Sequence, residues 1–300
     1  MKLNINILKE PTEFVSACKN KEKELELSGS FNEEENENNI NNADPITEDF
    51  PYIKKGFKNA VKHWFFLCCL KFYTNLINKK LTNLKVVKNK KIKKIRGAVV
   101  TCNHISKADS FAVRKAIGTN LYYVAAEFNN FKGKMGYIAR NSGFLPLPQG
   151  LNKVKLRKFN EAMSHYLKRG KKILIYPEQS MWRDYKKPRP MKNGAFRYAS
   201  QNDVPIIPLF ITIKEKEEKI DKNGLVNFGD YTIYVLDPIY PKLELNLKEN
   251  IEYLRKENFR VWKELYEKTY GVPLEYSTLD KSKIEILLSH WDLVRNIQYI

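Results

Sequence analysis

The sequence predicts an α/β fold with a mixed, largely parallel sheet flanked by helices. Five short, mostly apolar segments read as buried strands, at residues 97–102, 121–126, 171–177, 204–213 and 231–237. Helical patterns lie between them near residues 109–118, 152–169 and 191–201. Strands that are apolar throughout and alternate with helices are typical of a parallel sheet covered on both faces.

Composition divides the chain of 300 residues into three predicted parts: 1–50, 51–96, and an α/β domain with C-terminal helices at 97–300. The net charge of +19 is uneven, because residues 1–50 carry 5 basic and 12 acidic side chains, whereas residues 51–96 carry 14 basic and no acidic ones. Such a basic surface attracts nucleic acids, anionic lipid headgroups or phosphorylated substrates.

Residues 1–50 are predicted to be an acidic, poorly structured leader. The stretch 31–45, FNEEENENNINNADP, is polar and has no periodic apolar face. Such a stretch cannot bury enough surface to offset the entropy of ordering it. We therefore expect no functional site in this part.

Residues 51–96 are predicted to contain a basic amphipathic helix. The apolar run 64–70 is far shorter than the roughly 20 residues that cross a bilayer. Aromatic rings bordered by lysines suit an anionic membrane surface, so we expect this segment to associate with a membrane. A helix packed on the main domain remains an alternative. The apolar residues recur at helical spacing, at Phe57, Val61, Trp64, Phe65, Cys68, Phe72 and Leu76.

The helix at 152–169 has Asn152 as its predicted N-cap and Gly170 as its end. Further helices are expected at 251–271 and 284–300. Residues 204–208, VPIIP, read as a strand start or an edge strand because of the two prolines.

The four cysteines form no C-x-x-C pair, and no metal-ligand spacing occurs. We therefore expect reduced thiols, no metal and no disulfide framework.

A histidine and an aspartate follow the strand at 97–102. Ligands of open α/β sheets bind at the carboxyl ends of strands, where His104 and Asp109 are predicted to lie. They meet if His104 is in the turn and Asp109 in the first turn of the next helix. A carboxylate behind an imidazole fixes its tautomer and stabilises its cation, which makes His104 a candidate general base.

A second polar cluster follows the strand at 171–177. Glu178 stands just beyond the strand, and the basic residues Arg183, Lys186, Lys187 and Arg189 follow it. A solvated loop accounts for the lysines, but it does not account for Pro177-Glu178 at the end of a buried strand. We therefore predict that Glu178 and the basic loop position a substrate.

Four blocks together resemble the glycerolipid acyltransferases, which are the 1-acyl-glycerol-3-phosphate acyltransferases and their relatives. They stand in the family's order over residues 97–212, and the helix before them is similar to the family's membrane-associating helices. The blocks are Asn103-His104 with Asp109, GFLPL at 143–147, Tyr176-Pro177-Glu178, and VPIIP at 204–208.

The resemblance implies transfer of a fatty acyl group from acyl-CoA or acyl carrier protein to the hydroxyl of a lysophospholipid similar to lysophosphatidic acid, in phospholipid biosynthesis. No cofactor besides the acyl donor is expected. The resemblance also implies a peripheral or monotopic protein at the cytoplasmic face of a membrane.

Two departures from the family pattern concern the acceptor. The second block normally ends in an arginine that helps to hold the acceptor phosphate, and Gln149 stands there. The third block usually reads F-P-E-G-T-R, whereas residues 176–181 read YPEQSM. We expect other residues to bind substrate, namely Asn103, Arg140, Glu178, Arg183, Lys186 and Arg189, with Lys187 as an alternative phosphate ligand.

In the predicted mechanism, His104 takes the proton of the acceptor hydroxyl while Asp109 orients it, which typically contributes about 10²–10⁴-fold. Backbone N–H groups near Asp109 are the expected oxyanion donors. The alternative is a non-catalytic basic protein that binds anionic lipid surfaces or, through its aromatic residues, nucleic acid. Because His104 and Asp109 are both present, we favour the enzyme and expect no nucleic acid partner.

Overall fold

The computed structural model describes residues 5–33, 43–118, 121–150, 152–217 and 219–278. Within these residues, seven strands form one sheet in the order β1-β7-β6-β2-β5-β3-β4. Only β6 and β7 are antiparallel, and the other neighbours are parallel. The prediction of a mixed, largely parallel sheet is confirmed. The strands are β1 (Lys85–Val87), β2 (Ala98–Thr101), β3 (Leu121–Ala126), β4 (Phe144–Leu147), β5 (Lys172–Ile175), β6 (Ile206–Lys214) and β7 (Asp230–Val235).

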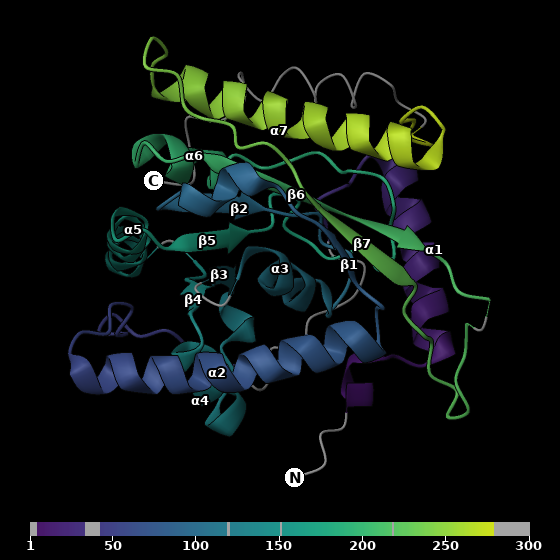
Figure 1. Ribbon diagram of the computed structural model, residues 1–300, viewed down its shortest axis with the longest axis horizontal. Helices are drawn as coiled ribbons and strands as arrows, with labels where there is room; N and C mark the ends of the chain where they lie inside the picture. The colour runs from purple at the N-terminus through teal and green to yellow at the C-terminus, as the bar shows by residue number, and fades with distance from the viewer. Residues whose placement is uncertain (1–4, 34–42, 119–120, 151, 218, 279–300) are drawn as a thin grey trace.

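Helices cover both faces of the sheet (Figure 1). One face packs against α5, α6 and α7 around Phe159, Phe196 and Trp262. The opposite face packs against α2 and α3 around Ile77, Ala112 and Val113. The α-helices are α1 (Thr12–Ser28), α2 (Phe57–Lys80), α3 (Asp109–Ile117), α4 (Gly133–Asn141), α5 (Lys153–Lys168), α6 (Gly194–Gln201) and α7 (Leu247–Tyr270). Short 3₁₀ turns occupy Ile5–Leu8, Lys90–Lys94 and Glu127–Asn129.

Two strands were missed by the sequence analysis. β4 is formed by the GFLPL block, which was read only as a motif. β1 lies inside the segment 51–96, which was predicted to be helical, and it pairs with β7 through Lys85↔Thr232 and Val87↔Tyr234. A division of the chain at residues 96 and 97 therefore cuts through the sheet.

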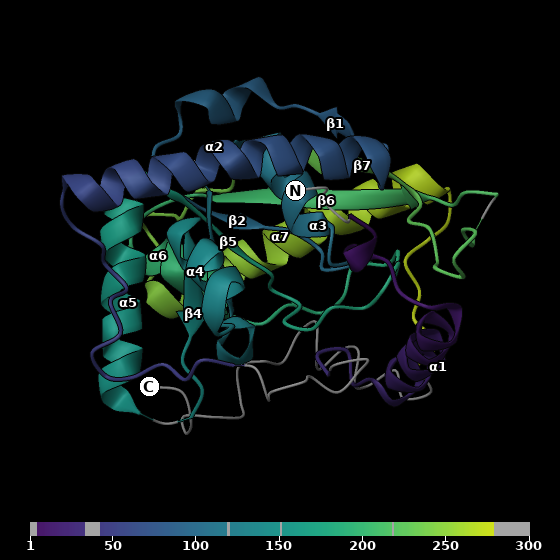
Figure 2. The same ribbon diagram turned by 90° about the horizontal axis from the view of Figure 1, so that it is seen from below.

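The prediction of a poorly structured leader is wrong for the described part of residues 1–50. α1 buries Val15, Cys18 and Leu25, and Phe31 beyond it is 1% exposed and packs against Trp182. These few apolar residues are enough to hold α1 on the domain because its acidic side chains also form contacts. Glu26 accepts hydrogen bonds from Lys187 and Tyr185. In Figure 2, α1 stands on the far side of the molecule from α2.

α2 packs on the domain through a face other than its apolar stripe. Its buried residues are Thr74, Ile77 and Asn78, and Asn78 Nδ2 donates to the carbonyl of Phe111 on α3 at 2.9 Å. The residues of the predicted apolar face point outward instead, with Trp64 66% exposed. The exposed members of this face are Phe57, Val61, Trp64, Phe65, Cys68 and Phe72.

The remaining elements mostly follow the prediction. The Asn152 side chain accepts from the N–H groups of Val154 and Lys155 and so caps α5. α7 corresponds to the helix expected at 251–271, and the helix expected at 284–300 lies outside the described residues. β6 begins at Ile206, within the VPIIP block, so the predicted strand start is confirmed, whereas the alternative of an edge strand is wrong because β6 is central and Pro208 lies within it. It is tolerated because its pairing with β7 begins one residue later, at Leu209↔Val235.

Candidate active site

His104 and Asp109 meet at the carboxyl end of the central strand β2. His104 lies in the turn after β2, and Asp109 is the first residue of α3. His104 Nδ1 and Asp109 Oδ2 are 2.7 Å apart. Because Nδ1 is engaged by the carboxylate, Nε2 on the other side of the ring is left to act on a substrate, and the His104 side chain is 23% exposed.

The Asp109 carboxylate is buried and receives four hydrogen bonds. Besides His104, Oδ2 accepts from the backbone N–H groups of Ile105 at 3.0 Å and Ser106 at 3.2 Å. Oδ1 accepts from the Tyr176 hydroxyl at 2.6 Å. The N–H groups of Ile105 and Ser106 therefore serve the carboxylate, which contradicts their use as oxyanion donors.

Glu178 and Arg189 form a buried ion pair that holds the turn of His104. Glu178 Oε2 accepts from the His104 backbone N–H at 3.0 Å and from Arg189 Nη2 at 2.9 Å. Glu178 Oε1 accepts from the Arg189 backbone N–H at 2.8 Å. Both side chains are 1% exposed. They hold the site from inside, and the structure shows neither side chain exposed for the predicted contact with substrate.

The Arg189 guanidinium also fixes the loop that follows β5. Its Nη1 donates to the carbonyl of Phe31 and to Ser180 Oγ, and its Nη2 donates to the carbonyl of Ser180. The same loop is tied to the His104 turn, because the N–H of Trp182 donates to the carbonyl of His104 at 3.1 Å.

The side chain of Asn103, which was predicted to bind substrate, has a structural role in the fold. Its Nδ2 donates to the carbonyl of Ile211 on β6 at 3.0 Å, and its Oδ1 accepts the Ile211 N–H at 2.8 Å. The side chain is 1% exposed. Its amide group is used to hold the turn to the neighbouring strand.

Apart from Arg189, the predicted basic ligands are not gathered at the site. Arg183 is 1% exposed and forms an ion pair with Glu10, which also binds Lys107. Lys186 pairs with Glu215 at 2.8 Å. Arg140 Nη1 donates to Asn130 Oδ1 and to the carbonyl of Phe131. The structure thus brings His104, Asp109, Glu178 and Arg189 together, but not Arg140 or Lys186.

Cys102 is not a nucleophile. Burial, followed by the charges of Asp109 and Glu178, raises the pKa of its thiol well above the ordinary value. Because the thiolate is the reactive form, this cysteine is inert. In the described ranges, no three His, Cys, Asp or Glu side chains are placed to hold a metal ion.

Three contributors to the site have little or no local signal in the sequence. Tyr176 belongs to the third block, and the sequence pattern assigns it no role of its own. Glu10 and Phe31 belong to the part that was expected to hold no site, and their partners Arg183 and Arg189 lie more than 150 positions away. The aromatic residue after a buried strand was the one local signal available.

Comparison with known proteins identifies an acyltransferase domain in the chain. Residues 83–212 match the family model described as Acyltransferase. An uncharacterized acyltransferase of Schizosaccharomyces pombe is 29% identical over 159 residues, which cover 52% of this chain and 56% of that protein. A chloroplastic 1-acyl-sn-glycerol-3-phosphate acyltransferase of Brassica napus is 30% identical over 74 residues, which cover 25% of this chain and 21% of that protein. The chain thus spans about half or less of these relatives.

The fold is similar to that of the 1-acyl-sn-glycerophosphate (LPA) acyltransferase PlsC from Thermotoga maritima. The TM-score is 0.55 at 18% sequence identity, and the match covers 76% of this chain and 89% of the other. The central part of the chain is therefore an acyltransferase domain. Together with the two acyltransferase relatives, this match supports the resemblance of the chain to the glycerolipid acyltransferases.

Proposed function

We propose that this protein transfers a fatty acyl group from acyl-CoA or acyl carrier protein to the hydroxyl of a lysophospholipid similar to lysophosphatidic acid, as a step of phospholipid biosynthesis. The observation that carries the proposal is the 2.7 Å hydrogen bond between His104 and the buried Asp109 at the carboxyl edge of the sheet. The substrates named for the two related acyltransferases support the choice of acceptor.

The proposed step needs one base and no covalent intermediate. His104 Nε2 takes the proton of the acceptor hydroxyl while its oxygen attacks the thioester carbonyl. The resulting imidazolium is stabilised by Asp109. The C–S bond then breaks, the ester is formed, and the sulfur of the donor leaves with the proton that His104 returns. A general base of this kind typically contributes about 10²–10⁴-fold.

An exposed apolar surface supports docking of the protein on an anionic membrane. The stripe on α2 includes Phe57, Trp64 and Phe72, and Met135 and Ile138 on the adjoining α4 are also exposed. The two helices meet where Phe66 contacts Tyr137. None of the helices in the described residues has the length and apolar character needed to cross a membrane. A peripheral or monotopic position at the cytoplasmic face, with the aromatic rings at headgroup depth, is consistent with this surface.

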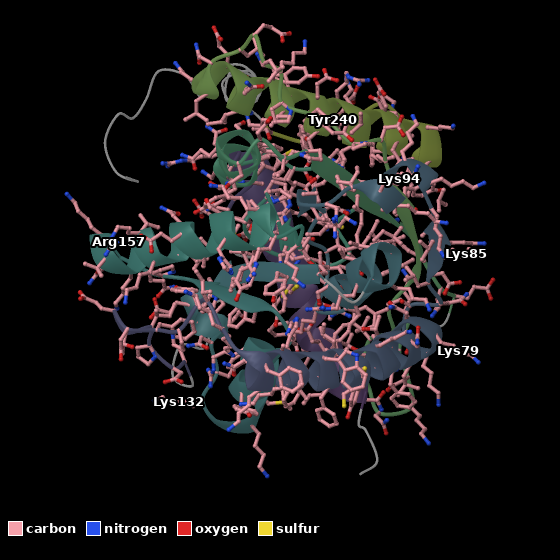
Figure 3. The ribbon with its side chains drawn as sticks, turned by 60° about the vertical axis from the view of Figure 1, so that its left-hand side comes forward. Lys79, Lys85, Lys94, Lys132, Arg157 and Tyr240 are labelled. Atoms are coloured by element: carbon pink, nitrogen blue, oxygen red, sulfur yellow. The ribbon has the colours of Figure 1, made fainter. Side chains whose placement is uncertain are left out.

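Basic side chains lie at the ends of the two helices that carry the apolar surface. Lys132 precedes α4 and Lys79 lies in the last turn of α2, and Figure 3 shows both of them projecting outward near the α2 side of the molecule. Since residues 51–96 contain no acidic side chain, this surface complements anionic headgroups.

The direct test is thiol release from a long-chain acyl-CoA and from acyl carrier protein, with anionic vesicles and lysophosphatidic acid. The lipid product is identified by mass. We expect acceptor-dependent release that His104→Ala lowers by at least about 10²-fold, whereas His165→Ala on α5 serves as the matched control and retains activity. No release with any acceptor, phosphorylated or not, would refute the enzyme and favour the alternative of a non-catalytic protein that binds anionic lipid surfaces.

A further inference from the structure

Tyr176 makes two contacts with the pair formed by His104 and Asp109. Its hydroxyl donates to Asp109 Oδ1 at 2.6 Å. Its ring lies flat against the imidazole of His104, with ring centroids 3.9 Å apart and planes 13° from parallel. One side chain therefore touches the base by its face and the carboxylate by its polar end.

The topology of the sheet places Tyr176 there. β5 and β2 are parallel neighbours, and Thr101 at the end of β2 is opposite Ile175 at the end of β5. Tyr176 directly follows Ile175, so it lies just beyond the end of β5, beside the turn that carries His104. A phenylalanine at this position keeps the ring contact but cannot donate the hydrogen bond.

The two contacts have different physical effects. The stacked ring restricts rotation of the imidazole and so keeps Nδ1 aimed at Asp109. The hydrogen bond from the hydroxyl draws the negative charge of the carboxylate toward Oδ1, the oxygen that does not contact the imidazole. Oδ2 then stabilises the protonated form of His104 less strongly. Burial, followed by the charge of Asp109, raises the pKa of Tyr176 well above its ordinary value, so the hydroxyl remains a donor over the working pH range.

We propose that Tyr176 is a positioning residue that lowers the pH at which His104 becomes an active base, by donating its hydroxyl to the far oxygen of Asp109. This inference rests on the proposed function for its kinetic consequence, but the effect on His104 itself exists without a substrate. The ring contact and the hydrogen bond make separable contributions, of which the first orients the base and the second sets its pH range.

Other charged and titratable groups surround the pair, and Tyr176→Phe leaves each of these side chains in the protein. Glu178 and Arg189 contact the backbone of His104, and Cys102 and Tyr231 lie within electrostatic range of Asp109. The groups from the packed elements are Cys102, Lys107, Arg114, Glu178, Arg183, Asp184, Arg189 and Tyr231.

The first test is the titration of the His104 ring followed by NMR, assigned by its loss in His104→Gln. In Tyr176→Phe we expect the titration midpoint to move to higher pH by roughly half a pH unit, because the carboxylate now supports the imidazolium more strongly. Tyr123→Phe removes a tyrosine hydroxyl from the neighbouring strand β3 and should leave the midpoint unchanged. No movement in Tyr176→Phe, or an equal movement in Tyr123→Phe, would overturn the inference whether or not the protein is an acyltransferase.

The second test is the pH profile of kcat/KM in the thiol-release assay. The acid limb of Tyr176→Phe should move to higher pH by the same amount, with a plateau lowered by no more than about tenfold, because one hydrogen bond is lost. Tyr176→Leu, which also lacks the ring, should lose roughly another tenfold at the plateau, and the phenylalanine should restore that part. An unchanged acid limb with a uniformly lower rate would show a merely structural role and would contradict the proposal. Inactive wild-type protein with the NMR shift present would instead refute the proposed function alone.

Discussion

The buried pair of Glu178 and Arg189 allows a prediction that separates bracing of the site from substrate binding. Arg189→Met removes the charge and keeps most of the volume. Glu178 then remains buried at 1% exposure and loses its charged partner. The main-chain carbonyls of Phe31 and Ser180 lose their donors as well.

The magnitude follows from this burial. Removal of one partner from a buried ion pair costs about 3–5 kcal/mol, since it leaves an uncompensated charge. For a chain of this size, roughly 2–4 °C is lost per kcal/mol, so we expect Tm to fall by roughly 6–20 °C. Glu178→Gln with Arg189→Met should be less destabilised than the two single variants added together, because no unpaired charge is then buried.

Urea unfolding followed by circular dichroism measures these differences, with the exposed Arg197→Met as control. A substrate-binding arginine would behave differently: its replacement would leave the free energy of unfolding within about 0.5 kcal/mol of wild type and would raise KM for the acceptor. That pattern would refute the bracing role and restore the interpretation made from sequence.

Two further predictions concern α1 and α2. Burial acts to raise the pKa of Glu26, but its bonds with Lys187 and Ser277 prevail and hold it below its ordinary value of 4.5. Ionised Glu26 therefore stabilises the fold above that pH, and the contribution is lost as the pH falls below 4.5. Glu26→Gln should flatten this acid dependence of Tm, and an unchanged dependence would exclude the contact as its source. On α2, Trp64 and Phe65 are 66% and 55% exposed, so their replacement by serine should leave stability unchanged. It should weaken flotation with anionic vesicles by roughly tenfold or more, and equal flotation of wild type and variant would rule out α2 as the docking surface.

The parts of the fold that sequence could predict are those whose signal is local. The apolar runs of β2 and β6 and the capped helix α5 are visible within a few residues. β1 was hidden because its three residues, Lys85–Val87, stand in a lysine-rich stretch and alternate between exposed and half-buried. α1 was hidden because its apolar residues are few and widely spaced among acidic ones.

The residues of the site also divide into those with a local signal in the sequence and those without one. His104 and Asp109 could be paired from sequence because they are five positions apart around a single strand end. The roles of Arg183 and Arg189 could not be predicted from sequence. A basic loop that binds phosphate has the same composition as a basic loop whose arginines form ion pairs with buried carboxylates. The difference comes from Glu10 and Phe31, which are distant in sequence, and from Glu178, which an irregular loop brings back toward Arg189.

The same contacts hold the backbone of the third block, which includes a residue in the left-handed region. Gln179 stands where the family usually has glycine, and its φ of 67° lies in the left-handed region. A side chain there costs about 1–2 kcal/mol. The fold bears this cost because the loop is held on both sides of Gln179: Glu178 is fixed by Arg189, and Trp182 is fixed to the carbonyl of His104. The change of sequence therefore removes an arginine from the block but leaves the contacts that hold the turn of His104 in place.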